Sequence, residues 1–178
     1  MRSQISGFTL LELMVTIFVM VILLGIGVPS YIQFKEDQTL LGAAQTLYGD
    51  IQLARSETIK RRSNDMFILF VSSDGQWCYR ISDNTANCVN SCSDTCDIQN
   101  DGITRGADSS RFQGVILDNI SYASGKLNFN SRRGITNEGD VDLRYGTSKT
   151  LRVHTSALGR ATICAPSGST YSGVQSCN

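Results

Sequence analysis

The sequence has little of what enzymes usually need. It contains one histidine, His154, in a strand-like segment near Ser156. It has no G-x-S-x-G turn, no glycine-rich phosphate loop and no paired metal-ligand motif. Because successive residues of a strand face opposite sides of a sheet, His154 is most simply a sheet residue. We therefore predict that the chain is not an enzyme and that it uses no cofactor.

The chain also lacks net charge, because 16 Lys and Arg residues balance 16 Asp and Glu residues. The composition as a whole therefore does not require nucleic acid or an anionic surface as a partner. The charges are unevenly distributed: residues 63–111 carry seven Asp and three Arg, whereas residues 112–178 carry seven Lys or Arg and four acids. The C-terminal part is mildly basic.

No cysteine precedes residue 78. The six cysteines that follow are Cys78, Cys88, Cys92, Cys96, Cys164 and Cys177. An even number in an exported region predicts disulfides formed in an oxidising compartment, although six thiols allow 15 pairings. We favour Cys164–Cys177, which would tie the weakly hydrophobic tail to the last strand. A metal site at the evenly spaced Cys88, Cys92 and Cys96 is the alternative, but the segment has no companion histidine.

A membrane-length apolar run occupies residues 8–28, where the polar residues are Thr9, Glu12 and Thr16. About 20 residues of helix span a bilayer core. A secretory signal would be followed by a small-residue cleavage site, whereas here Gly7 precedes the run. Cleavage after Gly7 would remove the leader, residues 1–7, and leave the apolar helix on the mature chain.

Pro29 ends the purely apolar portion, but a helical pattern resumes beyond it. Small and apolar residues recur at spacings of three and four, which predicts one buried face: Leu40, Ala44, Leu47, Ile51, Ala54 and Thr58. The opposite face carries Lys35, Glu36, Asp37, Asp50, Arg55, Glu57 and Lys60. We expect one helix from Phe8 to about Arg62, with a transmembrane part at 8–29 and an amphipathic part at 30–62 that packs on a sheet.

Residues 63–178 show the shorter period of strands. A hairpin is predicted from strands 66–71 and 77–82 around the turn Ser72–Gly75. Further strands are expected at 115–122, 126–130, 140–145, 151–155 and 161–164, with Gly125, Gly134, Gly139, Gly146 and Gly159 between them. The prediction is an α+β fold with a mainly antiparallel sheet, a cysteine-rich insertion at 83–110 and a disulfide-bonded tail.

The segment Gly7-Phe8-Thr9-Leu10-Leu11-Glu12-Leu13 resembles the class III signal of type IV pilins and type II secretion pseudopilins. The resemblance implies that a prepilin peptidase cleaves between Gly7 and Phe8 and that Phe8 is N-methylated. Glu12 would then be an assembly contact, its carboxylate paired with the N-terminal amine of a neighbouring subunit. An uncompensated carboxylate in a membrane helix costs about 2.5–3.5 kcal/mol, so such a pair would fix the register of incoming subunits.

The rest of the chain resembles the GspH/FimT branch of that superfamily at residues 52–61, 129–134 and 151–160. This resemblance implies the type IV pilin fold and a single-pass inner-membrane protein with a periplasmic globular domain, later part of a pilus at the cell surface. The expected partners are other major and minor pilins, which it contacts through the N-terminal helix. The leading hypothesis is a minor pilin that initiates or caps a filament, and the alternative is a minor pseudopilin of type II secretion.

Two binding hypotheses remain. FimT proteins are implicated in DNA uptake during natural transformation through a Gly-Arg-x-Arg motif, which Gly159-Arg160-Ala161-Thr162 matches except for Thr162. Affinity for double-stranded DNA grows with the number of phosphates neutralised, and the candidate cations are Arg132, Arg133, Arg144, Lys149, Arg152 and Arg160. A degenerate calcium loop is the second hypothesis, with oxygen ligands from Asp97, Gln99, Asp101 and Asp108.

Overall fold

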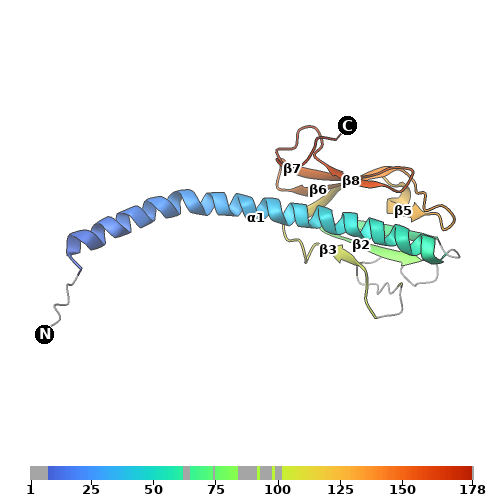
Figure 1. Cartoon of the computed structure of the whole chain (residues 1–178), viewed down its shortest axis with the longest axis horizontal. Coiled ribbons are helices and arrows are strands. Elements are labelled where there is room, and N and C mark those ends of the chain that lie inside the picture. Colours follow the sequence, from blue (N-terminus) through green and yellow to red (C-terminus); the bar gives the residue numbers. More distant parts are fainter. Residues whose placement is uncertain are drawn as a thin grey trace. The chain divides into compact units, whose positions relative to one another are not determined.

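The computed structural model describes residues 8–61, 65–73, 75–83, 92, 98 and 102–177. The chain forms two compact units, residues 1–36 and residues 37–178. One helix, α1 (Leu10–Arg61), runs through both units, and Pro29 lies inside it without ending it (Figure 1). The expected helix boundary at Arg62 lies outside the described residues, as does the leader with Gly7.

The buried face of α1 is the one predicted from its periodicity. All six residues of that face are fully buried: Leu40, Ala44, Leu47, Ile51, Ala54 and Thr58. Glu57, assigned to the solvent face, is instead buried and only 7% exposed. Its carboxylate lies 2.8 Å from Lys60 Nζ and 3.7 Å from Arg61 Nε. These two cations offset the cost of removing the charge from water, which explains why an acid occupies a position next to the core.

The strands form two four-stranded antiparallel sheets rather than the single sheet expected. The first has the order β3-β2-β1-β5 and the second the order β4-β6-β7-β8. The strands are β1 (Met66–Ser73), β2 (Gln76–Asp83), β3 (Gly106–Asp108), β4 (Val115–Ile120), β5 (Lys126–Phe129), β6 (Gly139–Tyr145), β7 (Lys149–Thr155) and β8 (Ala161–Cys164).

The division into two sheets occurs between β4 and β5, which follow each other in the chain but belong to different sheets. A short 3₁₀ turn, Ala123–Gly125, joins them. The Tyr122 hydroxyl donates to Gly139 O at 3.1 Å in the second sheet, while its ring stacks on Phe70 of the first at 5.7 Å between centroids. Trp77 Nε1 donates to Val115 O at 2.6 Å and joins the sheets again. Aromatic side chains with one polar atom are well suited to such a junction.

Several boundaries differ from those expected. The hairpin connection is shorter, because β1 pairs with β2 as far as Ser73 opposite Gln76. Asp74, part of the predicted turn, lies outside the described residues. The strand expected at 115–122 ends at Ile120 after a bulge between Leu117 and Asn119, and Gly139 begins β6 rather than preceding it. Strand β3 was not predicted, since its three residues are too short to show a period.

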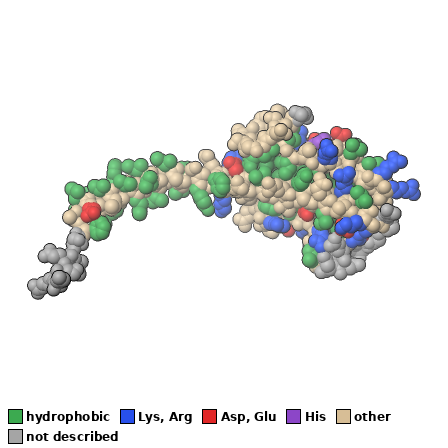
Figure 2. Space-filling view, viewed as in Figure 1, with side chains coloured by type: hydrophobic (Ala, Val, Ile, Leu, Met, Phe, Trp, Pro, Cys, Tyr) green, Lys and Arg blue, Asp and Glu red, His purple; other side chains and the backbone are tan. Residues whose placement is uncertain are grey.

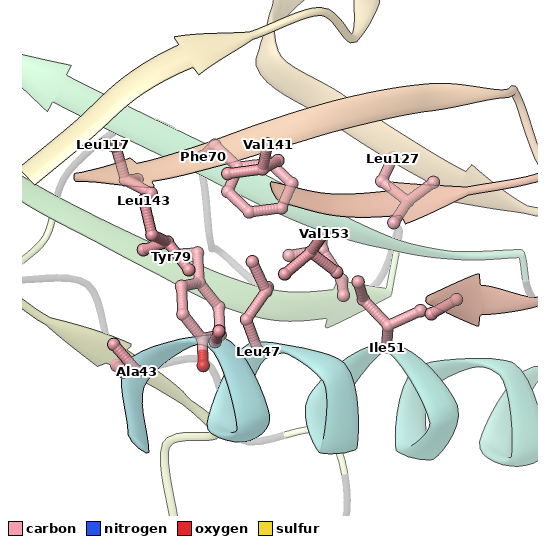
Figure 3. Close-up of a cluster of buried hydrophobic side chains, with 14 of the residues drawn as sticks. Ala43, Leu47, Ile51, Phe70, Tyr79, Leu117, Leu127, Val141, Leu143 and Val153 are labelled. Atoms are coloured by element: carbon pink, nitrogen blue, oxygen red, sulfur yellow. The ribbon is translucent and has the colours of Figure 1, made fainter. Parts of the chain in front are cut away.

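The core of the 37–178 unit is one cluster of side chains from α1 and from the inner faces of both sheets. Figure 3 shows Leu47 and Ile51 of the helix pointing toward Val141, Leu143 and Val153 of the second sheet, with Phe70 and Leu127 of the first sheet beyond. Because the helix contributes to the same cluster as both sheets, it holds them in one folding unit.

Two disulfides are present in the described part of the chain. Cys164 is bonded to Cys177, the pair that the sequence favoured, and Cys78 is bonded to Cys92. Cys88 and Cys96 lie outside the described residues. Because Cys92 is in a disulfide, it is not available as a metal-ligating thiolate in this state. The Cys78–Cys92 bond ties the insertion to β2 of the first sheet.

Candidate functional site

The N-terminal end of α1 is capped within the motif Thr9-x-x-Glu12. Thr9 Oγ1 accepts a hydrogen bond from Glu12 N–H at 3.2 Å, and Thr9 O accepts from Leu13 N–H at 3.1 Å. A Thr N-cap with Glu three residues later is the sequence pattern of a capping box. The cap places the Glu12 carboxylate in the first turn of the helix, where the helix dipole favours negative charge.

The apolar side chains of the first unit are exposed within the single chain. Phe8 is 79% exposed and Leu10 is 77% exposed. The same helix is long and apolar enough to cross a membrane by length and composition. Glu12 is also exposed, and no hydrogen bond or ion pair of its carboxylate is found among the described residues. Lipid or neighbouring helices must therefore cover these side chains, because water would solvate them poorly.

Three of the six cations considered for DNA binding are already paired with carboxylates. Arg144 Nη2 lies 3.1 Å from Asp118 Oδ1, and Lys149 Nζ lies 2.8 Å from Asp37 Oδ1. Arg152 forms a two-pronged contact, with Nε and Nη2 at 2.7 and 2.8 Å from the two oxygens of Asp142. Pairing with a protein carboxylate reduces the charge that each cation offers to a phosphate.

The other three cations, Arg132, Arg133 and Arg160, are exposed and lie on two adjacent turns. No ion pair of these side chains is found in the part of the chain that the structure describes. A Cβ at Gly159 would lie 2.6 Å from Gly134 O, and Thr136 N–H donates to Ala157 O at 3.1 Å. The turns 130–134 and 156–160 therefore touch, and we call them together the glycine-turn tip. Figure 2 shows Lys and Arg side chains gathered at the right-hand end of the globular unit.

Arg55 of α1 lies beneath the glycine-turn tip. A Cβ at Gly159 would lie 3.0 Å from Arg55 Nε, and one at Gly134 would lie 2.8 Å from Ile59 Cδ1. Both glycines also have positive φ, +62° at Gly134 and +73° at Gly159. Side chains at these positions would collide and would strain the backbone, so the close approach of the turns to the helix requires glycine.

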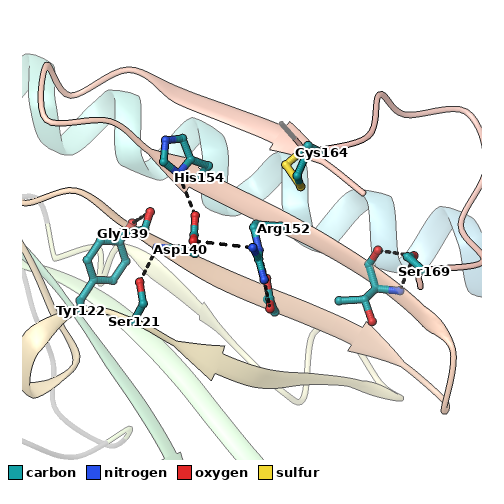
Figure 4. A network of polar contacts seen from close by, with 11 residues as sticks. Ser121, Tyr122, Gly139, Asp140, Arg152, His154, Cys164 and Ser169 are labelled. Carbon is teal, nitrogen blue, oxygen red and sulfur yellow. Dashed lines mark hydrogen bonds and ion pairs between the residues drawn. A yellow bond between two sulfur atoms is a disulfide. The ribbon is translucent and has the colours of Figure 1, made fainter. Parts of the chain in front are cut away.

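A row of alternating charges covers the outer face of the second sheet (Figure 4). His154 Nδ1 lies 2.8 Å from Asp140 Oδ1, and its Nε2 lies 3.9 Å from Glu138 Oε1. Arg152 Nη1 lies 3.8 Å from Asp140 Oδ2, beside its closer partner Asp142. The hydrogen bond with Asp142 raises the pKa of Arg152. His154 is thus a sheet residue in a charge network, which agrees with the prediction from sequence.

The calcium hypothesis has one ligand that the structure describes. Asp108 Oδ1 accepts hydrogen bonds from the Ser110 hydroxyl and from Ser110 N–H, and its Oδ2 lies 3.4 Å from Arg80 Nη2. The hydrogen bond from the Ser110 side chain is the main cause of the lowered pKa of Asp108. Its carboxylate therefore closes a turn after β3. The other proposed ligands, Asp97, Gln99 and Asp101, lie outside the described residues.

Sequence reasoning missed two polar contacts that the structure brings together. Tyr79 donates its hydroxyl to Asp50 Oδ2 at 2.8 Å, and burial raises the pKa of Asp50. Asn137 closes the free edge of β5, with its Oδ1 accepting from Asn128 N–H and its Nδ2 donating to Lys126 O. Tyr79 and Asp50 are 29 residues apart, and Asn137 is 9 and 11 residues from its two partners, so neither helix nor strand periodicity indicates these contacts.

A membrane-length helix with a capped N-terminus, whose second half packs on antiparallel sheets, defines the class of type IV pilins and pseudopilins. A family model described as "Type II transport protein GspH" matches residues 43–159, so the chain belongs to the GspH family. A second, described as "Prokaryotic N-terminal methylation motif", matches residues 2–28. No curated protein gives a match, and no solved structure does either.

These findings establish a pilin or pseudopilin with a class III signal peptide. The apolar helix together with the methylation motif identifies an inner-membrane anchor that the subunit uses before assembly. Members of this family are structural components rather than enzymes.

Proposed function

We propose that this protein is a minor pilin of a type IV pilus, incorporated into the filament and acting at its initiation or tip. The observation that carries the proposal is the N-terminal motif followed by an apolar helix that has no covering among the described residues of its own chain. A helix of this kind is stable in lipid, and in a filament it is covered by the helices of neighbouring subunits. The minor pseudopilin of a type II secretion system is the alternative, to which the name of the family points.

The N-terminal geometry supports a role for Glu12 in assembly. Cleavage between Gly7 and Phe8 would place the new amine one residue before the Thr9 cap. In a parallel bundle, the methylated amine of Phe8 from an incoming subunit would then meet the Glu12 carboxylate of its neighbour. Such a pair would relieve about 2.5–3.5 kcal/mol of cost for an isolated carboxylate in a membrane. The relief is available only at one axial offset, so it would select the register of assembly.

Substitution of Glu12 tests this role. Glu12→Gln and Glu12→Leu should both leave the protein in the inner membrane, because neither reduces the hydrophobicity of the helix. Both should reduce its recovery in sheared filaments by about tenfold or more, as expected for the loss of about 2 kcal/mol per contact. Met14→Leu is the matched control, since it changes an exposed side chain on the same helix without altering charge. Normal incorporation of Glu12→Leu would contradict the proposal.

The two filament systems are distinguished by where the protein goes. A type IV pilus extends from the cell, so a minor pilin should be recovered with sheared surface filaments and its deletion should reduce surface pili. A pseudopilin should stay in the cell envelope, and its deletion should reduce protein secretion. Recovery of the protein only with pseudopilins, together with a secretion defect, would exclude the pilus assignment.

DNA binding is a second candidate, and the glycine-turn tip favours it. The turn 156–160 contains Gly159-Arg160 of the motif, and the adjacent turn brings Arg132 and Arg133 next to it. These three exposed cations offer more positive charge to a phosphate than Arg144, Lys149 and Arg152, which are paired with carboxylates. Thr162, in place of the second Arg of the motif, is an exposed residue of β8 and removes one expected cation.

A salt titration with labelled duplex DNA tests this candidate on the full chain in a neutral detergent. Binding at about 50 mM salt should weaken with a log–log slope of about −0.9 for each phosphate contact. Combining Arg132→Ala with Arg160→Ala should reduce that slope by about 2, whereas the paired control Arg144→Ala should change it by less than about 1. Absence of a shift at about 50 mM salt would end this proposal.

A further inference from the structure

Arg55 is a half-buried cation of α1 that the fold leaves without a counterion. Its Nε is buried and has no hydrogen-bond partner, and no hydrogen bond or ion pair of its guanidinium is found among the described residues. None of the residues three or four positions away on the helix is an acid, so the helix itself supplies no partner. Lys60 and Arg61, by contrast, both pair with Glu57. Because an unpaired cation beside the core costs free energy, a bound anion would stabilise Arg55.

The two glycine turns hold the Arg55 side chain where they meet. A Cβ at Gly159 would lie 3.0 Å from Arg55 Nε and 3.2 Å from its Cδ, and one at Gly134 would lie 3.6 Å from Nε. The terminal nitrogens of the guanidinium are not among the buried atoms without a partner, so a ligand can reach them from outside. A side chain that is positioned before its ligand arrives loses less entropy on binding.

The glycine-turn tip carries an excess of positive charge. Two carboxylates are nearby: Asp65 Oδ1 accepts from Ser131 N–H at 2.7 Å, and Glu138 Oε1 lies 3.9 Å from His154 Nε2. Among the residues that the structure describes, neither carboxylate forms an ion pair with any of the four arginines at or beneath the tip, which are Arg55, Arg132, Arg133 and Arg160. Four cations close together favour a polyanion over a single negative charge.

Exposed apolar side chains gather at the same tip. In the described part of the 37–178 unit, five large apolar side chains are exposed, and three of them belong to the segments that meet here: Ile59, Ile135 and Leu158. Leu158, next to Gly159 in its turn, is 72% exposed, the largest fraction of the five. Apolar groups that cluster within a polar rim mark an interaction surface, whereas isolated ones do not. The ligand should therefore offer apolar surface as well as negative charge.

Duplex DNA offers both kinds of surface. Each phosphate can accept two parallel hydrogen bonds from a guanidinium, and the sugars between the phosphates present apolar faces. An acidic segment of a partner protein also combines charge with apolar groups. The four arginines favour DNA, because its phosphates repeat at about 3.4 Å along each strand and can engage several cations at once.

We propose that Arg55 is a fourth phosphate contact of the glycine-turn tip and that Leu158 packs against the sugars of the same duplex. This inference rests on the DNA-binding candidate described above and adds two residues to it. Arg55 supplies a charge that is already held in position, and Leu158 supplies a contact that does not depend on charge. Neither residue reads a base, so the binding is independent of sequence.

Salt titrations of the full chain with labelled duplex DNA, in a neutral detergent, test the role of Arg55. Arg55→Gln should reduce the slope of log affinity against log salt by about 1, because one phosphate contact is lost. Arg55→Lys should keep most of the slope, since it keeps the charge. Lys60→Gln is the matched control: it removes the same charge from the same helix, but Lys60 is paired with Glu57. Its slope should stay close to that of the parent.

The same titrations test the role of Leu158. Leu158→Ser should weaken binding about threefold to tenfold at every salt concentration without changing the slope, because an apolar contact releases no counterions. Leu158→Met should bind like the parent, since it keeps an apolar side chain of similar size. A peptide of alternating Glu and Leu should not displace the duplex. Its displacement of the duplex would indicate a protein partner and would overturn the inference.

The outcomes separate this inference from the DNA-binding proposal. Equal slopes in Arg55→Gln and Lys60→Gln would overturn the role of Arg55 and leave DNA binding intact. Unchanged affinity in Leu158→Ser would overturn the apolar contact, and this test holds even if Arg55→Gln fails to fold, because Leu158 is exposed in a turn. Failure of the parent to bind at about 50 mM salt would end both proposals.

Discussion

The contact between the two glycine turns can be tested by adding one methyl group. Gly159 lies in the turn between β7 and β8 at φ +73°, and a Cβ there would lie 2.6 Å from Gly134 O. It would also lie 3.0 Å from Arg55 Nε. The carbonyl belongs to a main chain that cannot rotate away, so Gly159→Ala must separate the two turns or displace them from α1.

The expected loss follows from two separate costs. A left-handed conformation costs an alanine about 1–2 kcal/mol, partly offset by about 0.4–1 kcal/mol from the reduced entropy of the unfolded chain. Overpacking at a close contact adds about 1–3 kcal/mol. Gly146→Ala isolates the first cost, because Gly146 has φ +65° and a Cβ added there would meet nothing within 4 Å. We expect about 0.5–1 kcal/mol for Gly146→Ala and about 2–4 kcal/mol for Gly159→Ala.

Thermal unfolding of the full chain in detergent, followed by the fluorescence of buried Trp77, measures both variants. A loss of 1 kcal/mol lowers the Tm of a domain of this size by about 2–4 °C. Gly159→Ala should therefore unfold about 5–15 °C below the parent, and Gly146→Ala within about 4 °C of it. Equal losses in the two variants would refute the reasoning, because backbone strain alone would then explain both.

Three further outcomes are expected. Replacing Cys164 and Cys177 together by Ser should lower the free energy of unfolding by about 3 kcal/mol in urea titrations, since their separation of 13 residues closes a short loop; an unchanged midpoint would contradict this. Leu47→Ala should cost about 2–5 kcal/mol because Leu47 is fully buried, whereas Tyr48→Ala, at 38% exposure, should cost clearly less. Burial raises the pKa of Asp50, against the hydrogen bond from Tyr79 and the charges of Arg111 and Arg105. The folded state therefore holds this proton more tightly than the unfolded state, and the stability it contributes falls as the pH rises from the ordinary value through the raised pKa. In Asp50→Asn, the free energy of unfolding measured in urea should no longer fall over this pH range. The same pH dependence in the variant and the parent would contradict this prediction.

Periodicity predicted the parts of the fold that depend on local pattern. The buried face of α1 could be derived from sequence because side chains three and four residues apart share a helix face. Most strands were located because runs of apolar residues end at glycine. Glu57 was misassigned, since its burial depends on Lys60 and Arg61 rather than on its position in the pattern. Strand β3 exists because Tyr79 and its neighbours in β2 offer it an edge.

The candidate sites also differ in whether they depend on neighbouring residues or on residues that only the fold brings together. The Gly7–Glu12 motif is contiguous, so it could be found in the sequence. The six candidate cations could be named but not ranked, because whether a cation is free depends on which carboxylate the fold brings beside it. Arg152 meets Asp142 across a strand pair, and Lys149 meets Asp37 of α1, far away in the chain. The structure thus leaves three exposed cations at the glycine-turn tip.

By itself, the sequence determined a membrane helix with an N-terminal cleavage and methylation motif, an amphipathic continuation and a series of short strands, because each is encoded in neighbouring residues. Tertiary structure alone decided that the strands form two sheets, that the tail pairs with Ala165, and that the glycine turns meet over Arg55. Strand pairing and ion pairing join residues that are distant in the chain, so their energies depend on the whole fold.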